Sequence, residues 1–238
     1  MKILFISLGC DKNLADSEEM LGLLTGNGHE IVDSEEEADA IVINTCCFIH
    51  DAKEESVNTI LEMAEYKKTG TCKILIVTGC MAQRYKEEIT EEIPEVDAVL
   101  GTTSYGDIVK ALNEAEAGHV FQEFKDINAL PEDSGRRVIT TGGHFGYLKI
   151  AEGCDKHCTY CIIPSLRGKF RSVPEERLLK QAEYMASQGV SLHRKQPSMV
   201  LIFTAKKLCI SFLRNFARLK ESVGSVFFTV IRRKFMMN

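Results

Sequence analysis

Residues 73–80 read KILIVTGC, a short run of apolar and β-branched residues that ends in glycine and cysteine. Such a run has the length of a buried strand rather than of a helix. Similar stretches recur in the first half of the chain: KILFISLG (2–9), HEIV (29–32), AIVINTC (40–46) and DAVLG (97–101). Apolar residues at helical spacing separate these stretches, at 16–24, 51–66, 82–93 and 105–115. Strands that alternate with helices of this length predict an α/β fold with a parallel, doubly wound sheet.

The second half of the chain departs from this alternation. Residues 118–139 contain glycine, proline and the polar run EDSGRR, and we interpret them as a linker after an N-terminal domain of residues 1–117. GYLKIAEGC (146–154) predicts one more strand, and the amphipathic pattern of 174–188 predicts one more helix. Residues 140–190 therefore look like the opening β-α unit of a second domain.

The totals describe an ordinary soluble chain. It has 238 residues, of which 45% are hydrophobic and 26% charged, with a net charge of −5. The start, MKILFISLGC, lacks the basic region, long apolar core and cleavage site of a signal peptide. We therefore expect the protein in the cytoplasm, where nine cysteines indicate metal binding or chemistry more than disulfides.

Three cysteines follow predicted strands directly. Cys10, Cys46 and Cys80 end the stretches ISLGC, VINTC and IVTGC. Because the carboxyl ends of parallel strands lie along one edge of a sheet, where such folds bind ligands, the fold could gather the three thiols into one site. The alternative is three separate buried cysteines that act as small apolar residues. We assign such a structural role to the remaining cysteines outside the motif below: Cys47, Cys72 and Cys209.

A second group, Cys154, Cys158 and Cys161, has C-x3-C-x2-C spacing within one loop. Zinc would need a fourth ligand, and the neighbouring His157 has the right chemistry but an unfavourable position next to Cys158. A [4Fe–4S] cluster held by three thiolates would keep one iron open for a substrate or cosubstrate. Tyr160 could pack on a bound adenine or could simply be a core aromatic.

C-x3-C-x2-C with an aromatic residue before its last cysteine resembles the radical S-adenosylmethionine superfamily. The stretches LGCDKNLADSE, INTCCF and VTGCMAQ resemble the N-terminal domain of the methylthiotransferases within it. The resemblance implies two [4Fe–4S] clusters, one on Cys154, Cys158 and Cys161. The other cluster, on Cys10, Cys46 and Cys80, takes part in methylthio transfer. The cosubstrate S-adenosylmethionine binds the open iron of the first cluster, with Tyr160 beside it, and its reductive cleavage gives a radical that abstracts hydrogen.

Two branches of this family modify different substrates. LGCDKN, FIHDAKEES and YLKIAEGCDKHCTYCIIPSLRGKFRS resemble the branch that adds a methylthio group to the β-carbon of an aspartate in small-subunit ribosomal protein twelve. The alternatives are a tRNA adenosine methylthiotransferase and a non-catalytic iron–sulfur fragment. The sulfur donor and the electron donor remain unspecified by the sequence.

Basic residues alternate after the cysteine motif, at Arg167, Lys169 and Arg171. Some of them could contact a carboxylate or the sulfonium cosubstrate. The alternative is a solvated basic loop.

The resemblance covers residues 1–190 and stops there. The family continues with the rest of a partial (β/α) barrel and a small β-domain. Residues 191–238 instead form an irregular tail with ten basic residues and one acidic residue, whereas residues 1–190 have a net charge of −14. We interpret this tail as out of frame, so that the chain is a truncated, inactive or impaired enzyme. The alternative is a basic segment that binds RNA.

Overall fold

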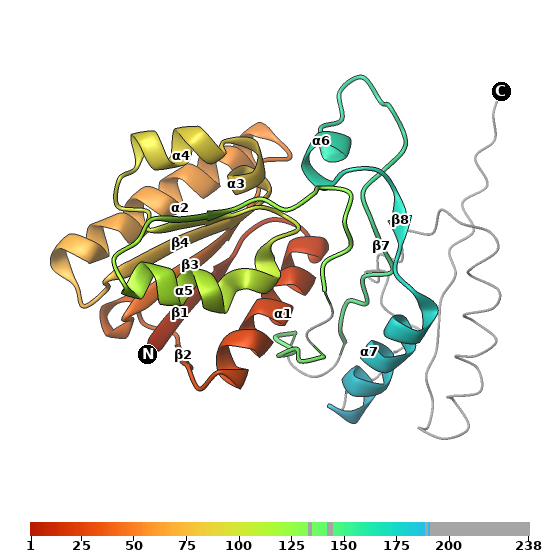
Figure 1. The fold of residues 1–238 in the computed structure, drawn as a ribbon, viewed down its shortest axis with the longest axis horizontal. Helices are drawn as coiled ribbons and strands as arrows, with labels where there is room; N and C mark the ends of the chain where they lie inside the picture. Colours follow the sequence, from red (N-terminus) through yellow and green to blue (C-terminus); the bar gives the residue numbers. More distant parts are fainter. Residues whose placement is uncertain (133–134, 142–144, 189, 191–238) are drawn as a thin grey trace. The chain divides into compact units, whose positions relative to one another are not determined.

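The computed structural model of the chain describes residues 1–132, 135–141, 145–188 and 190 (Figure 1). Its contacts form two compact units. The first contains residues 1–138 and 151–172, and the second contains 139–150 and the described residues after 172. Among the described residues, no helix is long and apolar enough to cross a membrane. The basic tail of 191–238 lies outside the described residues.

A six-stranded sheet forms the centre of the first unit, and every neighbouring pair of its strands is parallel. The strands are β1 (Lys2–Ser7), β2 (Glu30–Val32), β3 (Ala40–Thr45), β4 (Ile74–Gly79), β5 (Ala98–Leu100) and β6 (Phe121–Glu123). Their order is β2-β1-β3-β4-β5-β6, so the chain reverses its direction of winding between β1 and β3. Doubly wound sheets with this type of strand order bind ligands at the switch point, where the direction of winding reverses. The predicted parallel α/β fold is confirmed.

Helices cover both faces of this sheet (Figure 1). They are α1 (Asp11–Gly26), α2 (His50–Thr69), α3 (Cys80–Arg84), α4 (Lys86–Glu92) and α5 (Ile108–Glu116), with single 3-10 turns at Glu35–Glu37 and Tyr105–Asp107. One face carries α2, α3 and α4 over Ile41, Ile43 and Leu75. The other carries α1 and α5 over Val42 and Ile76. Successive side chains of a strand point to opposite faces, and a strand buried on both faces is therefore apolar throughout.

Three local features differ from the sequence prediction. β6 lies inside the stretch interpreted as a linker, because three edge residues paired with β5 give almost no pattern. The helix predicted for 82–93 is two helices, α3 and α4, with a break at Tyr85. The helix predicted for 16–24 begins five residues earlier, at Asp11, because polar residues of its first turns are buried rather than exposed.

The remaining elements are short except for one helix. β7 (Ala151–Glu152), α6 (Ile163–Arg167) and β8 (Arg171–Ser172) belong to the first unit, and α7 (Glu175–Ser187) belongs to the second. The strand predicted for 146–154 is reduced to the two residues of β7, which pair antiparallel with β8. The amphipathic helix predicted for 174–188 is confirmed as α7.

Candidate functional site

The three strand-end cysteines lie where the sequence placed them. Cys10 is the residue before α1 and follows β1, Cys46 directly follows β3, and Cys80 follows β4 as the first residue of α3. β1, β3 and β4 are neighbours in the sheet, so the three residues share its carboxyl edge. The edge includes the switch point between β1 and β3. Cys46 and Cys80 are buried, whereas Cys10 is exposed and opens this edge to solvent.

Two glycines let the backbone turn at these cysteines. Gly9 has φ +91° and Gly79 has φ +95°, in the region that glycine tolerates best. A Cβ on Gly9 would lie 2.6 Å from Cβ of Cys46, and one on Gly79 would lie 2.5 Å from the carbonyl oxygen of Thr45. The strand ends are therefore packed too closely for any side chain at either position.

Asn13 in the first turns of α1 holds the strand ends together. Its fully buried amide donates to the carbonyls of Leu8 (3.0 Å) and Thr45 (2.8 Å). Its Oδ1 lies 3.7 Å from Sγ of Cys80. Asn44 in turn donates to the backbone carbonyl of Asn13 at 2.9 Å. Sequence reasoning missed Asn13, although its place three residues after Cys10 in a helix that starts at the site was a usable signal.

The three thiols are electrostatically coupled. Burial raises the pKa of the Cys80 thiol, and the neighbouring Cys46 and Cys10 raise it further. The charge of Arg167 and its hydrogen bond to Cys80 act in the opposite direction and lower this pKa. Thiolates are the form that binds metal, so a nearby cation favours the ligand state of Cys80.

Cys47 and Cys72 have the structural role expected of them. They are 2% and 3% exposed within the apolar core beside α2. Burial, and to a lesser degree the charge of Cys80, raise the pKa of Cys47 to about 12. Cys209 lies outside the described residues.

We therefore expect alkylation of the iron-free native protein to spare Cys47. A pKa of about 12 lowers its thiolate fraction at neutral pH on the order of a thousandfold relative to an ordinary thiol. Iodoacetamide at pH 7 followed by peptide mass spectrometry should modify the exposed Cys158 within minutes and leave Cys47 intact until the protein is unfolded. Equal labelling of both residues in the folded protein would contradict the burial.

The second group of cysteines occupies a surface loop of the same compact unit. Cys154 and Cys161 are half-buried, and Cys158 is exposed. The amide of Cys161 donates to the carbonyl of Cys158 at 3.0 Å, and the amide of Cys154 donates to the carbonyl of Gly168 at 3.0 Å. The loop is thus closed at its base by the residues that follow α6, and Cys158 is its most exposed cysteine.

The aromatic residue of the motif is not part of a core. Tyr160 is 89% exposed, so the interpretation as a core aromatic is wrong. His157 is exposed as well. Both side chains project from the cysteine loop, and the role of Tyr160 against an adenine stays a prediction.

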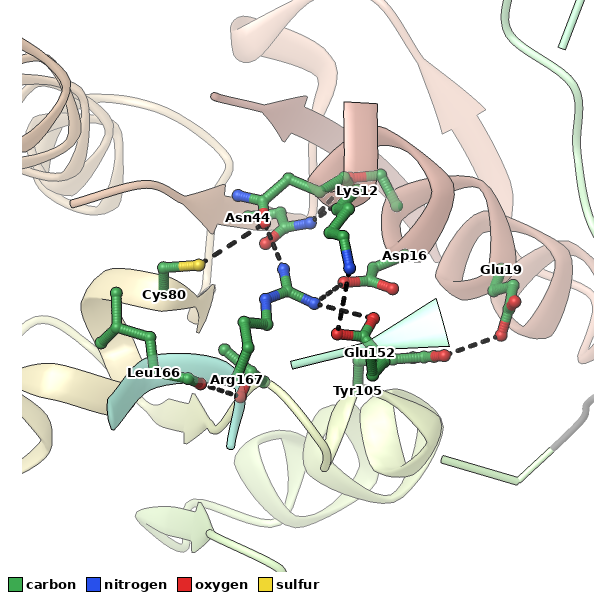
Figure 2. A network of polar contacts seen from close by, with 12 residues as sticks. Lys12, Asp16, Glu19, Asn44, Cys80, Tyr105, Glu152, Leu166 and Arg167 are labelled. Atoms are coloured by element: carbon green, nitrogen blue, oxygen red, sulfur yellow. Dashed lines mark hydrogen bonds and ion pairs between the residues drawn. The ribbon is translucent and has the colours of Figure 1, made fainter. Parts of the chain in front are cut away.

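The three basic residues after the motif behave differently from one another. Lys169 is exposed, as expected for a solvated loop. Arg171 is half-buried and donates to backbone carbonyls, among them that of Arg167 at 2.8 Å. Arg167 is 5% exposed and donates to Asp16 and Asn13 in the N-terminal half of the chain, so the interpretation as a solvated loop is wrong for this residue. Its guanidinium instead contacts the carboxylate of Asp16 within the protein (Figure 2).

The donor set fits iron–sulfur ligation by type and by place. Within the described part of the chain, no three His, Cys, Asp or Glu side chains are spaced to hold one metal ion. A single ion needs its donors around one point, whereas a four-iron cluster presents separate irons to separate thiolates. The three strand-end cysteines share the carboxyl edge of neighbouring strands, and the charges of Cys46 and Cys10 both act on the pKa of Cys80.

Comparisons with known proteins now assign the fold to a class. Residues 2–101 match the model of a family described as "Uncharacterized protein family UPF0004". This match covers five of the six strands of the sheet, β1 to β5, and the three strand-end cysteines.

Curated relatives narrow the assignment. The chain is 64% identical over 190 residues to "Ribosomal protein uS12 methylthiotransferase RimO" of Lachnoclostridium phytofermentans, with 80% of this chain and 43% of the relative covered. The proteins of the same name from Clostridioides difficile and Acetivibrio thermocellus are 50% identical over 190 residues and 49% identical over 196 residues. The alignments cover 80% and 79% of this chain, and 43% of each relative. The chain belongs to this methylthiotransferase family, which confirms the family and branch predicted from the sequence, and it spans 43% of the length of these relatives.

Proposed function

We propose that the protein is a cytoplasmic methylthiotransferase that modifies the β-carbon of an aspartate in ribosomal protein uS12. The observation that supports this most is the presence of two complete sets of three cysteines within one compact unit. The relatives carry the name of this activity, and their identity to the chain reaches 64%. The ribosomal protein is the proposed partner.

We propose two [4Fe–4S] clusters and S-adenosylmethionine as cofactors. Cys10, Cys46 and Cys80 would hold one cluster, and the loop cysteines Cys154, Cys158 and Cys161 would hold the other. A cluster with an open iron supplies the electron that cleaves S-adenosylmethionine. The exposed Tyr160 stands next to Cys161, where it could lie against the adenine of the cosubstrate.

We infer that the residues around the cysteines hold the site in position and do not themselves react. Asn13 ties the ends of β1 and β3, and Arg167 lies beside Cys80. The exposed Cys10 leaves one approach to the strand-end site open to a sulfur donor or a substrate. Cys46 and Cys80 are buried.

A chimera tests the function directly. Residues 1–190 of this chain would replace the aligned part of the Lachnoclostridium phytofermentans relative, to which the chain is 64% identical. We expect the reconstituted chimera to add one methylthio group to an aspartate of uS12, detected by peptide mass spectrometry. The relative itself is the positive control. A chimera that binds both clusters and modifies tRNA adenosine, or modifies nothing, would contradict the proposal.

We expect the 238 residues by themselves to give little or no turnover, because they span 43% of the relatives' length. Turnover comparable to that of a full-length relative would contradict this expectation. We also propose the division into a domain of 1–117, a linker of 118–139, the start of a barrel domain at 140–190 and a tail of 191–238. Another reading frame of the coding DNA after codon 190 should encode further barrel sequence if the tail is out of frame.

A further inference from the structure

Arg167 is a buried cation that joins segments far apart in the sequence. Its Nη1 donates to Oδ2 of Asp16 at 2.6 Å, and its Nη2 donates to Oδ1 of Asn13 at 2.5 Å. Nη1 also lies 3.4 Å from Oε1 of Glu152. Figure 2 shows the guanidinium between α1 and β7, with Asp16 and Glu152 on one side and Cys80 on the other. Removing such a group from water is costly unless its hydrogen bonds are satisfied.

This position connects the two groups of cysteines. Arg167 is the last residue of α6 and lies six residues after Cys161 of the loop motif. Its Nη2 and Sγ of Cys80 in the strand-end group both contact Oδ1 of Asn13, at 2.5 and 3.7 Å, and the charge of Arg167 lowers the pKa of the Cys80 thiol. The segment that closes the loop of Cys154, Cys158 and Cys161 is thus anchored at the edge where Cys80 lies.

Other contacts also fix α6 and β7 to the rest of the unit. Thr102 donates to the carbonyl of Leu166 at 2.7 Å, and Lys12 donates to the carbonyl of Ala151 at 2.9 Å. Lys12 also lies 3.8 Å from Oε2 of Glu152. If Arg167 served only to hold α6 in place, these contacts would share its task, and a change of charge at position 167 would leave the strand-end site unaffected.

We propose that Arg167 is a positioning residue that sets the electrostatics of the site formed by Cys10, Cys46 and Cys80. The proposal rests on the proposed function, since it takes these cysteines as ligands of an iron–sulfur cluster. Asp16 and Asn13 hold the guanidinium against Cys80, and α6 carries it there from the loop motif. One residue thereby couples the structure of the loop to the charge of the strand-end site.

The reduction potential of the cluster follows from this arrangement. Net charge, hydrogen bonds to sulfur and solvent exposure set the potential of an iron–sulfur cluster. A buried cation at Cys80 favours the reduced, more negative state, and the low local dielectric strengthens the effect. Loss of Arg167 should therefore lower the midpoint potential, which a purely structural residue would leave unchanged.

The measurement uses the 238-residue chain with alanine at 154, 158 and 161, reconstituted anaerobically so that iron reports on the strand-end site alone. Arg167→Gln should lower the midpoint potential by at least about 59 mV, a tenfold change for a one-electron couple. Arg167→Lys keeps the charge and should retain most of the parent potential. A folded Arg167→Gln protein with full iron content and an unchanged potential overturns the proposal.

Asp16→Asn provides a second measurement of opposite sign. Removing the carboxylate that faces Arg167 should raise the potential, and an unchanged potential with full iron content overturns the proposal even where Arg167→Gln holds no iron. Loss of iron in both variants, with iron retained in the control, shows a structural role only and overturns the proposal. The control is Arg137→Gln. This substitution breaks a buried ion pair with Glu18, which lies on α1 as Asp16 does, with 2.5 Å between Nη2 of Arg137 and Oε2 of Glu18. It should lower stability and leave the potential unchanged.

The parent protein separates this proposal from the proposed function. If the parent with alanine at 154, 158 and 161 binds no iron, the strand-end cluster and the inference fail together. If it binds iron and the potentials do not respond, the inference alone fails.

Discussion

Replacing Gly79 by alanine is expected to remove the iron of the strand-end site and to lower the free energy of unfolding by about 3 kcal/mol. Gly79 has φ +95° and ψ −156°, a region that is essentially restricted to glycine. An added Cβ would also lie 2.5 Å from the carbonyl oxygen and 2.9 Å from the amide nitrogen of Thr45. Backbone atoms of the neighbouring β3 cannot move aside without shifting Cys46 relative to Cys80. Urea unfolding of the iron-free chain and iron analysis after reconstitution measure the two effects.

Gly118→Ala is the matched control for this substitution. Gly118 has a similar φ of +81°, but nothing lies within 4 Å of the position that a Cβ would take. The Gly118→Ala protein should have a free energy of unfolding about 1 kcal/mol lower because of backbone strain, and it should bind as much iron as the parent. If Gly79→Ala kept its iron and lost no more stability than Gly118→Ala, the close packing of the strand ends would not matter for the site.

Local pattern predicted the parallel sheet and the placement of its cysteines. KILIVTGC and AIVINTC are apolar without alternation, as expected for strands that are buried on both faces, and β4 and β3 are buried at every residue. Once the sheet was predicted, a cysteine directly after a strand could be assigned to one edge. The parallel topology alone places these cysteines at one edge, and this placement requires no knowledge of side-chain contacts.

Features that depend on distant contacts could not be predicted in the same way. The polar start of α1 resembles a solvated helix, yet Asp16, Glu18 and Glu19 are buried. Their partners are Arg167, Arg137 and Tyr105, which lie between 86 and 151 residues away. No local period reveals such pairs. For the same reason, Arg167 appeared in the sequence as one of three alternating basic residues.

The two cysteine groups are expected to bind iron independently. Alanine at 154, 158 and 161 should remove about half of the roughly eight irons of the reconstituted chain, because two four-iron clusters share them. The loop thiols are exposed or half-buried, so the free energy of unfolding should change by less than about 0.5 kcal/mol. In the chimera the same change should abolish formation of 5′-deoxyadenosine.

Alanine at 10, 46 and 80 should remove the other half of the iron with a different effect on stability. Cys46 and Cys80 are 5% and 8% exposed among buried neighbours, so their truncation should cost about 1 kcal/mol or more each. Cleavage of S-adenosylmethionine should persist in this chimera, whereas methylthio transfer should stop. The two variants thus dissociate cleavage from transfer. Loss of all iron in either variant would instead indicate one shared site, and the division of the six cysteines into two groups would be wrong.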